Sequence, residues 1–431
     1  MIFLRASDPD FAPRFDALVS AGRDSAADVS RDVAAIIDRV RAEGEVAVVD
    51  YTSRFDRHDL SETDWSIPPE TCAAAFDALD PGLRQALELA AARIRAYHER
   101  QRPADTAYTD DAGVKLGARW RPVDAAGLYV PGGRAAYPSS LLMNAIPALV
   151  AGVERLCIVT PTPGGQVNPL VLAAAHLCGI TELWRVGGAQ AVAALAHGAG
   201  PIRPVDVVTG PGNAWVAEAK RQLYGVVGID MVAGPSEIVV IADGANDPDW
   251  IAADLLSQAE HDTVTQSILF TDNEAFAREV AARVGAQLDR LATGSVARVA
   301  WEANGALIIV DRLEDAIHLS DRLAPEHLQL AVDDPQPLFD RVRHAGSVFL
   351  GRHTPEAIGD YVAGPNHVLP TGRRARFASG LSVLDFMKRT SFLHLDEASL
   401  RELGPATVAL AEAEGLPAHA KSVALRLRLN H

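Results

Sequence analysis

The sequence predicts an α/β fold with two Rossmann-like domains, each built on an incomplete and mostly parallel sheet. From about 125 to 235, short β-rich runs alternate with longer helical ones, as where AGLYV is followed by PSSLLMNAIPALVAG. A second alternating series begins near 236 with EIVVIAD and PDWIAADLLSQAEH. Such alternation is typical of βαβ units around a parallel sheet. Before and after the two series, the apolar residues have mainly helical spacing.

These patterns predict four segments. We expect an N-terminal arm over 1–25 and a first α/β domain that joins 26–128 to 237–381. A second α/β domain takes 129–236, and a C-terminal helical piece takes 382–431. Two α/β halves in one chain predict a ligand cleft near the carboxyl ends of their strands.

Composition and charge exclude several classes of protein. Apolar residues make up 48% of the 431 residues and charged ones 22%, which is ordinary for a folded globular protein. The net charge of −16 leaves no basic surface large enough for nucleic acid. The start MIFLRASDPDF does not resemble a secretory signal, and no stretch approaches the roughly 20 apolar residues that a spanning helix needs. We therefore expect a cytoplasmic protein with no membrane partner.

The three cysteines are not expected to form a site. Cys72, Cys157 and Cys178 are odd in number, widely spaced and set in apolar surroundings. They are interpreted as reduced core residues and not as a disulfide framework or a thiolate zinc site.

A helix is expected over 248–260, with Asp247 as its cap and Pro248 at its first position. Asp254, Gln258 and His261 recur at i, i+4 and i+7, so they share one polar stripe. The stripe is either a solvated helix face or part of a metal site. An imidazole and an amide oxygen can bind a divalent ion if other ligands come from elsewhere.

Two further segments carry groups able to move protons or bind a metal. In DRLAPEHLQLAV, Glu326 and His327 precede an apolar strand, either as a polar surface turn or as a paired acid and base. Neighbours in an extended chain point opposite ways, so a shared site requires the bend that Pro325 allows. The rigid loop GDYVAGPNHVLPTG presents Asp360 and His367, as preorganised ligands or as ordinary turn residues.

The glycine-rich turns are ambiguous in the same way. TGPGNAWVAEAK and RVGGAQAVAAL each run from a strand through glycine into a helix, a setting in which backbone amides cradle phosphate. Neither completes G-x-G-x-x-G, because Trp215 stands where the third glycine would fall. In EAEGLPAHAKS, Glu414 and His419 flank a helix start, as surface residues or as ligands. The protease motif HExxH is absent.

Taken together, the motifs resemble one family. SQAEHD, APEHLQL, GDYVAGPNHVLPT, GPGNAWVAEAKR, VAGPSE, SGLSVLDF and EGLPAHAKS occur in a single chain, and the set is similar to that of histidinol dehydrogenases. The resemblance runs from the helical N-terminal part to the last helix.

The resemblance implies a ligand set and a quaternary structure. One zinc ion per subunit would be held by Gln258, His261, Asp360 and His419. His419 and Glu414 would enter the active site from the partner subunit of a homodimer, with the other metal and catalytic residues in the first α/β domain. The substrate, L-histidinol, would contact Ser236, the four zinc ligands, His327 and Glu414, whose carboxylate would hold the imidazole end.

The resemblance also implies the cofactor and the chemistry. Tyr129, Gln190 and Asn213 match the family's contacts with NAD⁺. Histidinol would be oxidised through histidinaldehyde to histidine by two NAD⁺ in turn, the last step of histidine biosynthesis. His327 would remove the hydroxyl proton and Glu326 would activate water to attack the aldehyde.

Three positions depart from the family pattern, and other functions stay open. Trp215 replaces an expected tyrosine, and Arg373 and Arg374 follow TG where smaller residues are usual. The alternatives are a related NAD-dependent dehydrogenase of another small amino or polar alcohol, a zinc hydrolase with Glu326 as base, and a non-enzymatic metal or nucleotide binder. Glu414 disfavours another alcohol, because a carboxylate placed for an imidazole N–H would then lack a partner.

Overall fold

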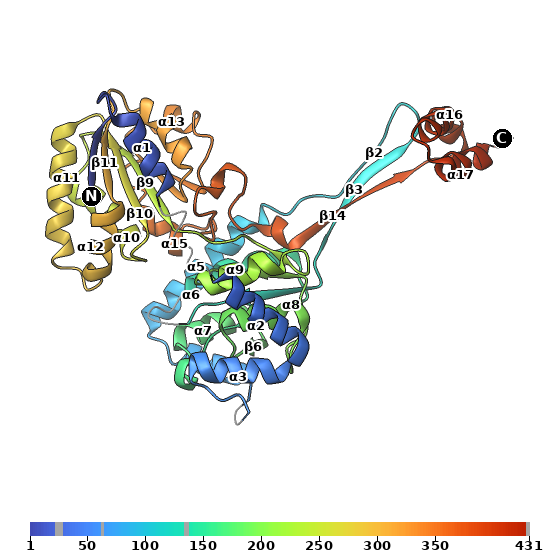
Figure 1. Ribbon diagram of the computed structural model, residues 1–431, viewed down its shortest axis with the longest axis horizontal. Helices are drawn as coiled ribbons and strands as arrows, with labels where there is room; N and C mark the ends of the chain where they lie inside the picture. Colours follow the sequence, from blue (N-terminus) through green and yellow to red (C-terminus); the bar gives the residue numbers. More distant parts are fainter. Residues whose placement is uncertain (22–28, 62–63, 133–137, 428–431) are drawn as a thin grey trace. The chain divides into compact units, whose positions relative to one another are not determined.

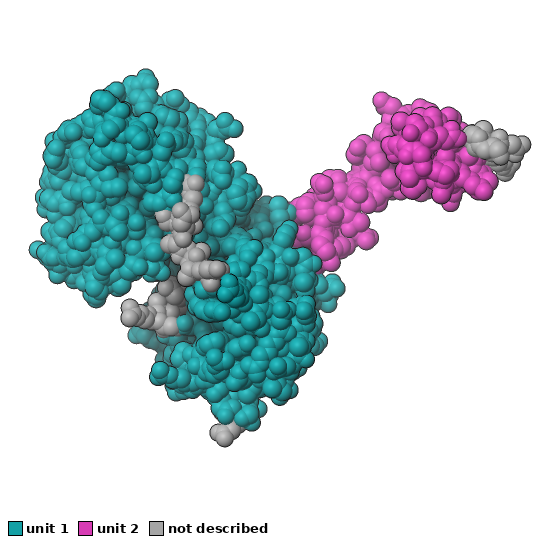
Figure 2. Space-filling view, in the orientation of Figure 1, with its two compact units in different colours: residues 1–101, 124–386 teal, residues 102–123, 387–431 magenta. Residues whose placement is uncertain are grey.

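The computed structural model describes residues 1–21, 29–61, 64–132 and 138–427. They form two compact units, shown in teal and magenta in Figure 2. Unit 1 comprises Met1–Gln101 and Asp124–Phe386, and unit 2 comprises Arg102–Val123 and Met387–His431. Within the described residues, no helix is long and apolar enough to cross a bilayer.

A six-stranded parallel sheet forms the first half of unit 1, with the order β1-β11-β10-β9-β12-β13. Its strands are β1 (Ile2–Arg5), β9 (Glu237–Ala242), β10 (Gln266–Thr271), β11 (Ala306–Ile309), β12 (His327–Ala331) and β13 (Ser347–Leu350). Every residue of β9, β10 and β12 is buried, so the continuous apolar runs of the sequence correspond to strands covered on both faces.

Helices cover both faces of this sheet (Figure 1). One face packs against α1 (Phe11–Ser20) and α13 (Asp315–Leu323), and the other packs against α10 (Pro248–Ala259), α11 (Glu274–Leu288) and α12 (Gly294–Asn304). The side chain of Asp247 accepts a hydrogen bond from the Asp249 N–H, which confirms the predicted cap of α10. Two short helices, α14 (Gln336–Phe339) and α15 (Ala357–Tyr361), follow β12 and β13.

A five-stranded parallel sheet forms the second half, with the order β6-β5-β4-β7-β8. Its strands are β4 (Ala125–Tyr129), β5 (Arg155–Val159), β6 (Glu182–Trp184), β7 (Val207–Thr209) and β8 (Gly228–Ile229). The helices around it are α2 (Ser30–Glu43), α3 (Glu45–Asp56), α4 (Pro69–Asp77), α5 (Pro81–Glu99), α6 (Pro138–Ala151), α7 (Pro169–Leu177), α8 (Gly188–His197) and α9 (Ala214–Leu223). The predicted class, two α/β domains with mostly parallel sheets, is confirmed.

Unit 2 is built from two segments that are distant in the sequence. The antiparallel strands β2 (Thr106–Thr109), β3 (Lys115–Pro122) and β14 (Met387–His394) pair in the order β14-β3-β2. The helices α16 (Glu397–Ala413) and α17 (Pro417–Leu427) pack through a small core of Val408, Ala411, Ala420 and Ala424. Leu393, Leu410 and Leu425 remain about two-thirds exposed, at 68%, 65% and 64%.

Three short 3₁₀ turns complete the described elements: η1 (Pro163–Gly165), η2 (Arg374–Arg376) and η3 (Val383–Phe386). Cys72, Cys157 and Cys178 are all buried and free of disulfides, as predicted.

Candidate active site

The candidate proton-transfer groups lie at the amino edge of the six-stranded sheet. Ser236 directly precedes β9, and Glu326 precedes β12, whose first residue is His327. Gln258 is in the last turn of α10, which runs back toward the start of the strands. The sequence predicted a ligand site at the carboxyl ends; in this sheet it is at the opposite edge, because a helix that follows a parallel strand ends beside the strand starts.

His327 is the centre of the cluster. Its side chain is buried, and its Nδ1 lies 2.9 Å from Oε1 of Gln258. Its Nε2 lies 3.6 Å from Oε1 of Glu356 and 4.0 Å from Oε1 of Glu326. An amide and two carboxyl groups therefore surround one imidazole within contact distance.

Asp360 adds a third carboxyl group to the cluster. Its Oδ1 lies 3.5 Å from Nδ1 of His367, and the same ring nitrogen lies 2.9 Å from the backbone oxygen of Asp360. One possible ligand atom each of His327, Glu356 and Asp360 lie within 4.8 Å of one another. His261 is close enough to act electrostatically on both His327 and Asp360. The sequence-predicted ligands Gln258, His261 and Asp360 thus converge around His327.

Burial shifts the protonation equilibria of the acid and the base. It lowers the pKa of His327 to about 4, with the charge of Asp360 acting in the opposite direction. Burial also raises the pKa of Glu326 well above its usual value, against the hydrogen bond with Ser236. The imidazole is therefore neutral near pH 7 and can accept a proton. Oε2 of Glu326 is buried and has no hydrogen-bond partner in the described part of the chain.

The two remaining carboxyl groups shift in opposite directions. Burial, followed by the charge of Asp360, raises the pKa of Glu356 to about 8. Burial would raise the pKa of Asp360 as well, yet the hydrogen bond from His367 and the nearby imidazoles hold it below the usual value. Asp360 is therefore the carboxylate of the cluster that is best suited to bind a cation.

Glu356 is a member of the cluster that sequence reasoning missed. It is 2% exposed, and its Oε2 accepts a hydrogen bond of 3.1 Å from the Ser257 hydroxyl. A signal was present, because Glu356 stands four residues before Asp360 and one helical turn brings such a pair to the same face. The segment HTPEAIGDY was too short to give a helical pattern.

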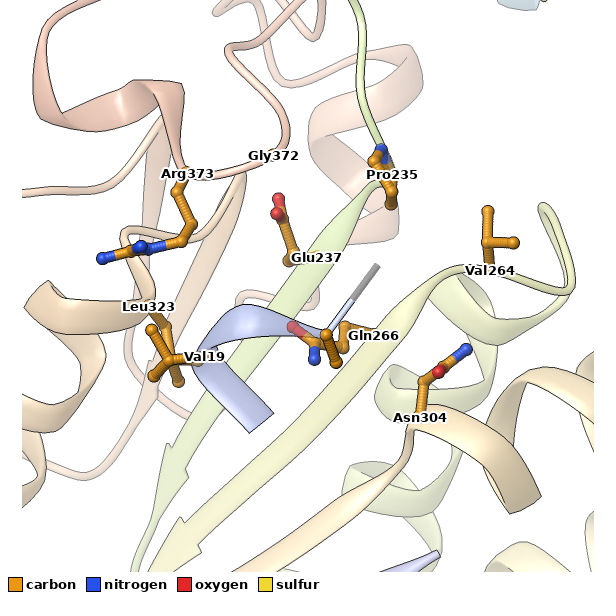
Figure 3. A pocket seen from close by; sticks show the side chains of 10 residues that line it. Val19, Pro235, Glu237, Val264, Gln266, Asn304, Leu323, Gly372 and Arg373 are labelled. Carbon is orange, nitrogen blue, oxygen red and sulfur yellow. The ribbon is translucent and has the colours of Figure 1, made fainter. Parts of the chain in front are cut away.

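Glu237 is a second buried acid beside this edge. Burial raises its pKa to about 8, and hydrogen bonds from the backbone N–H groups of Glu326, Arg373 and Gly372 act in the opposite direction. Figure 3 shows its carboxyl group directed toward Gly372, next to a cavity of about 20 Å³. The guanidinium of Arg374 also acts on it electrostatically. Arg373 thus contacts Glu237 through its backbone N–H, and Arg374 acts on it through its charge. Neither arginine is among the described residues that line the larger cavity of unit 1.

That larger cavity, of about 390 Å³, lies at the five-stranded sheet. Its lining includes Tyr129 at the carboxyl end of β4, Gln190 in α8 and Asn213 directly before α9. The Tyr129 hydroxyl accepts a hydrogen bond of 3.1 Å from the Gly188 N–H. Here the predicted residues do gather at the carboxyl side of a parallel sheet, and Trp215 also lines the cavity.

Two polar side chains in this cavity have hydrogen-bonding capacity left for a ligand. The Oδ1 atom of Asn213 accepts the N–H groups of Trp215 and Val216, at 3.1 and 3.2 Å, which leaves its amide N–H groups available. Oε1 of Gln190 is buried and no donor reaches it from the described residues. An orphaned polar atom of this kind fits a cavity that receives a polar ligand.

A buried ion pair fixes the glycine turn before Asn213. Lys220 and Asp230 form a salt bridge with side chains 4% and 1% exposed. Lys220 donates to the backbone oxygen of Gly210 at 2.9 Å, and Asp230 accepts the Gly210 N–H at 2.9 Å. Gly210 has φ +115°, and a Cβ there would lie 2.1 Å from the backbone oxygen of Tyr129. Glycine is required for this close approach of two backbones.

Glu414 and His419 belong to unit 2. Glu414 directly follows α16 and His419 lies in the first turn of α17, and both are exposed in the single chain. They are therefore the two predicted site residues outside the unit that holds the His327 cluster.

Fold and site together define an α/β enzyme with a buried cluster of imidazole and carboxyl groups and a separate cavity of about 390 Å³. The sequence model described as histidinol dehydrogenase matches residues 20–427. The histidinol dehydrogenase of Zymomonas mobilis is 61% identical over 427 residues, with 99% of each chain covered. That of Caulobacter vibrioides is 60% identical, with 98% of each chain covered.

A solved structure agrees with the sequence relatives. The crystal structure of histidinol dehydrogenase from Elizabethkingia anophelis superposes with a TM-score of 0.94 and 36% identity, covering 99% of this chain and 98% of that one. The chain belongs to the histidinol dehydrogenase family. The resemblance inferred from the seven motifs is confirmed.

Proposed function

We propose that this chain oxidises L-histidinol to L-histidine through histidinaldehyde, with zinc and two NAD⁺, as the last step of histidine biosynthesis. The observation that carries the proposal is the buried His327, held between Gln258 and the carboxyl groups of Glu326 and Glu356, in a chain of this family.

The first oxidation requires a base. As hydride leaves the alcohol carbon for NAD⁺, the hydroxyl proton passes to the neutral imidazole of His327, giving the aldehyde. Burial, which keeps His327 uncharged, prepares it for this role.

The second oxidation requires water to be activated. Glu326, with one carboxyl oxygen that has no partner among the described residues, takes a proton from water as its oxygen bonds to the aldehyde carbon. The aldehyde oxygen would take the proton that His327 holds after the first oxidation, which gives the hydrate. His327 would then accept a hydroxyl proton of the hydrate as the second hydride passes to a second NAD⁺, and the acid is released. Ser236 holds Glu326 through a hydrogen bond, so the base keeps its orientation.

The chemistry of the donor set fits zinc. Gln258, His261 and Asp360 offer amide oxygen, imidazole nitrogen and carboxylate oxygen, and His419 of a second chain would add another imidazole. When bound, zinc supplies a positive centre that orients the substrate's amino and imidazole nitrogens. The protein's part is to place these four side chains at one point.

The larger cavity fits a nicotinamide dinucleotide. Its volume of about 390 Å³ is within the range of small-molecule sites. We assign Tyr129, Gln190 and Asn213 to the cofactor, because Gln190 and Asn213 retain unused hydrogen-bonding groups there.

We further propose a homodimer in which unit 2 completes the active site of the other chain. Its exposed leucines, Leu393, Leu410 and Leu425, are typical of a surface that a partner covers. Glu414 would accept a hydrogen bond from the substrate's imidazole N–H, which distinguishes histidinol from alcohols without that donor.

The test is a direct assay of the zinc-loaded protein with histidinol and NAD⁺, before and after a chelator. We expect two NADH per histidinol, loss of activity with the chelator and recovery on adding zinc. Small amino alcohols without an imidazole are the control and should be poor substrates. Absence of NADH, or NADH formed from those alcohols at the same rate, would contradict the proposal.

A further inference from the structure

One acidic side chain lines the large cavity but belongs to none of the glycine turns or family motifs described above. Asp56, the last residue of α3, lines it together with Tyr129, Gln190 and Trp215. It reaches the cavity from the helical region before the five-stranded sheet. Its charge acts electrostatically on the Tyr129 hydroxyl, which places the two groups near one another.

The carboxyl group of Asp56 lacks a donor. Its Oδ2 is buried and has no hydrogen-bond partner within the described ranges. Burial raises the pKa of Asp56 to about 6, so near pH 7 it is mainly a carboxylate that can only accept hydrogen bonds. An orphaned acceptor of this kind beside a cavity is satisfied by a hydroxyl or N–H group of the molecule that enters.

The rest of the lining decides which donor fits. Among the described lining residues, Asp56 is the one charged side chain, and no lysine or arginine accompanies it. A phosphate next to Asp56 would therefore meet like charge with no counter-ion among these described residues, whereas a sugar hydroxyl would donate to it. Phe55 and Trp215 also line the cavity and offer aromatic surface for a purine base.

Building on the proposed use of NAD⁺, we propose that Asp56 accepts a hydrogen bond from the 2′-hydroxyl of the adenosine ribose and so excludes NADP⁺, which carries phosphate there. Asp56 is then the residue that determines cofactor specificity. The same chemistry is known from dinucleotide folds that place an acid after the second strand; here it comes from the end of a preceding helix.

The test measures the affinity of the zinc-loaded full chain for dinucleotides by calorimetry and by quenching of tryptophan fluorescence. Trp215 contributes to this fluorescence from the wall of the cavity. The ligands are NAD⁺, NADP⁺ and NAD⁺ that lacks the adenosine 2′-hydroxyl. The variants are Asp56→Asn and Asp56→Ala. Glu45→Gln is the matched control, because Glu45 is exposed on the same helix and loses the same charge.

A hydrogen bond to a charged group predicts a loss of roughly tenfold or more in affinity when either partner is removed. The unaltered protein should bind the deoxy cofactor about tenfold more weakly than NAD⁺, and NADP⁺ more weakly still. Asp56→Ala should bind NAD⁺ and the deoxy cofactor equally, because the hydroxyl then has nothing to donate to. Asp56→Asn should reduce the ratio of the affinity for NAD⁺ to that for NADP⁺. Glu45→Gln should leave the affinities for all three dinucleotides unchanged.

The inference is overturned if Asp56→Asn keeps the original preference, or if Asp56→Ala still distinguishes the deoxy cofactor from NAD⁺. Failure of the proposed function gives a different result. In that case the Asp56 variants show the expected binding pattern, but histidinol yields no NADH. If the inference alone fails, histidinol is still oxidised and the Asp56 variants bind the three dinucleotides with the same preferences as the original protein.

Discussion

Oε1 of Gln258 lies 2.9 Å from Nδ1 of His327, so the amide that ends α10 is in direct contact with the imidazole that begins β12. A residue assigned to the metal is thus adjacent to the residue assigned to proton removal. Because the two side chains come from different elements of one rigid sheet domain, their roles can be separated by substitution.

Replacing His327 by alanine should abolish proton removal and leave zinc bound. General-base catalysis contributes on the order of 10²- to 10⁴-fold, so kcat should fall by that amount. His261→Ala should instead lose zinc and activity together. Elemental analysis of both purified variants checks this, and equal loss of zinc in the two would refute the division of roles.

Shared active sites predict recovery of activity on mixing two inactive variants. His419→Ala chains and His327→Ala chains are each inactive as homodimers. After exchange of subunits, half of the dimers should be hybrids with one intact site, giving about a quarter of the original activity. The NADH assay before and after exchange measures this. The control is a mixture of two separate preparations of His327→Ala. Activity in the test mixture no greater than in this control would rule out shared sites.

Glu237 predicts a pH-dependent contribution to stability. Its folded pKa of about 8 lies above the ordinary glutamate value, so its contribution to the free energy of unfolding is full below about pH 4.5 and is lost as the pH rises to 8. Glu237→Gln should remove this dependence on pH. The free energy of unfolding of the variant minus that of the original protein should therefore rise by a few kcal/mol from pH 5 to 8. Urea unfolding at several pH values tests this.

The control for Glu237 is Glu314→Gln, an exposed residue before α13. It removes one carboxyl group from the surface instead of the interior. A difference for Glu237→Gln that does not change between pH 5 and 8 would show that Glu237 is ionised throughout that range.

The buried pair of Lys220 and Asp230 predicts strong coupling. Lys220→Met leaves a buried carboxylate without its cation and should cost about 3–5 kcal/mol in the free energy of unfolding. Adding Asp230→Asn, which keeps an acceptor for the Gly210 N–H, should recover part of this loss. Denaturant unfolding of the single and double variants measures the coupling, and additive losses would contradict it.

A surface pair provides the comparison for Lys220. Arg283 and Glu279 form an ion pair with side chains 45% and 52% exposed. Solvent and salt weaken such a pair, so Arg283→Met should change the free energy of unfolding far less than Lys220→Met does.

The sequence predicted the fold class well, because alternating apolar runs mark strands and helices even where it is not known which strands pair. It did not predict β14, whose eight residues are mostly exposed and pair with β3, about 270 residues earlier. Nothing local in a solvent-exposed strand of this kind distinguishes it from a loop or a helix. The four-residue β1, which pairs with β11, was missed because it is too short to give a periodic pattern.

The site was predictable in part. Residue pattern alone left Gln258, His261 and Asp360 open, and the family resemblance selected them. Glu356 was missed because its helix is only five residues long. The position at the amino edge was missed because the general rule for parallel sheets favours the carboxyl edge. A signal was present, since Glu326 and His327 stand at the start of an apolar run and Gln258 at the end of the helix that follows another.

The strand pairing of unit 2 has a consequence for synthesis in the cell. β3 leaves the ribosome with residues 115–122, but its neighbour β14 begins at Met387 and follows only after most of the chain has been translated. Until then one edge of the β2–β3 hairpin stays without its partner strand, a state open to mispairing with other nascent chains. The larger unit is complete at Phe386 and can fold before residues 387–431 are made, so the synthesis of those residues decides when the hairpin is protected.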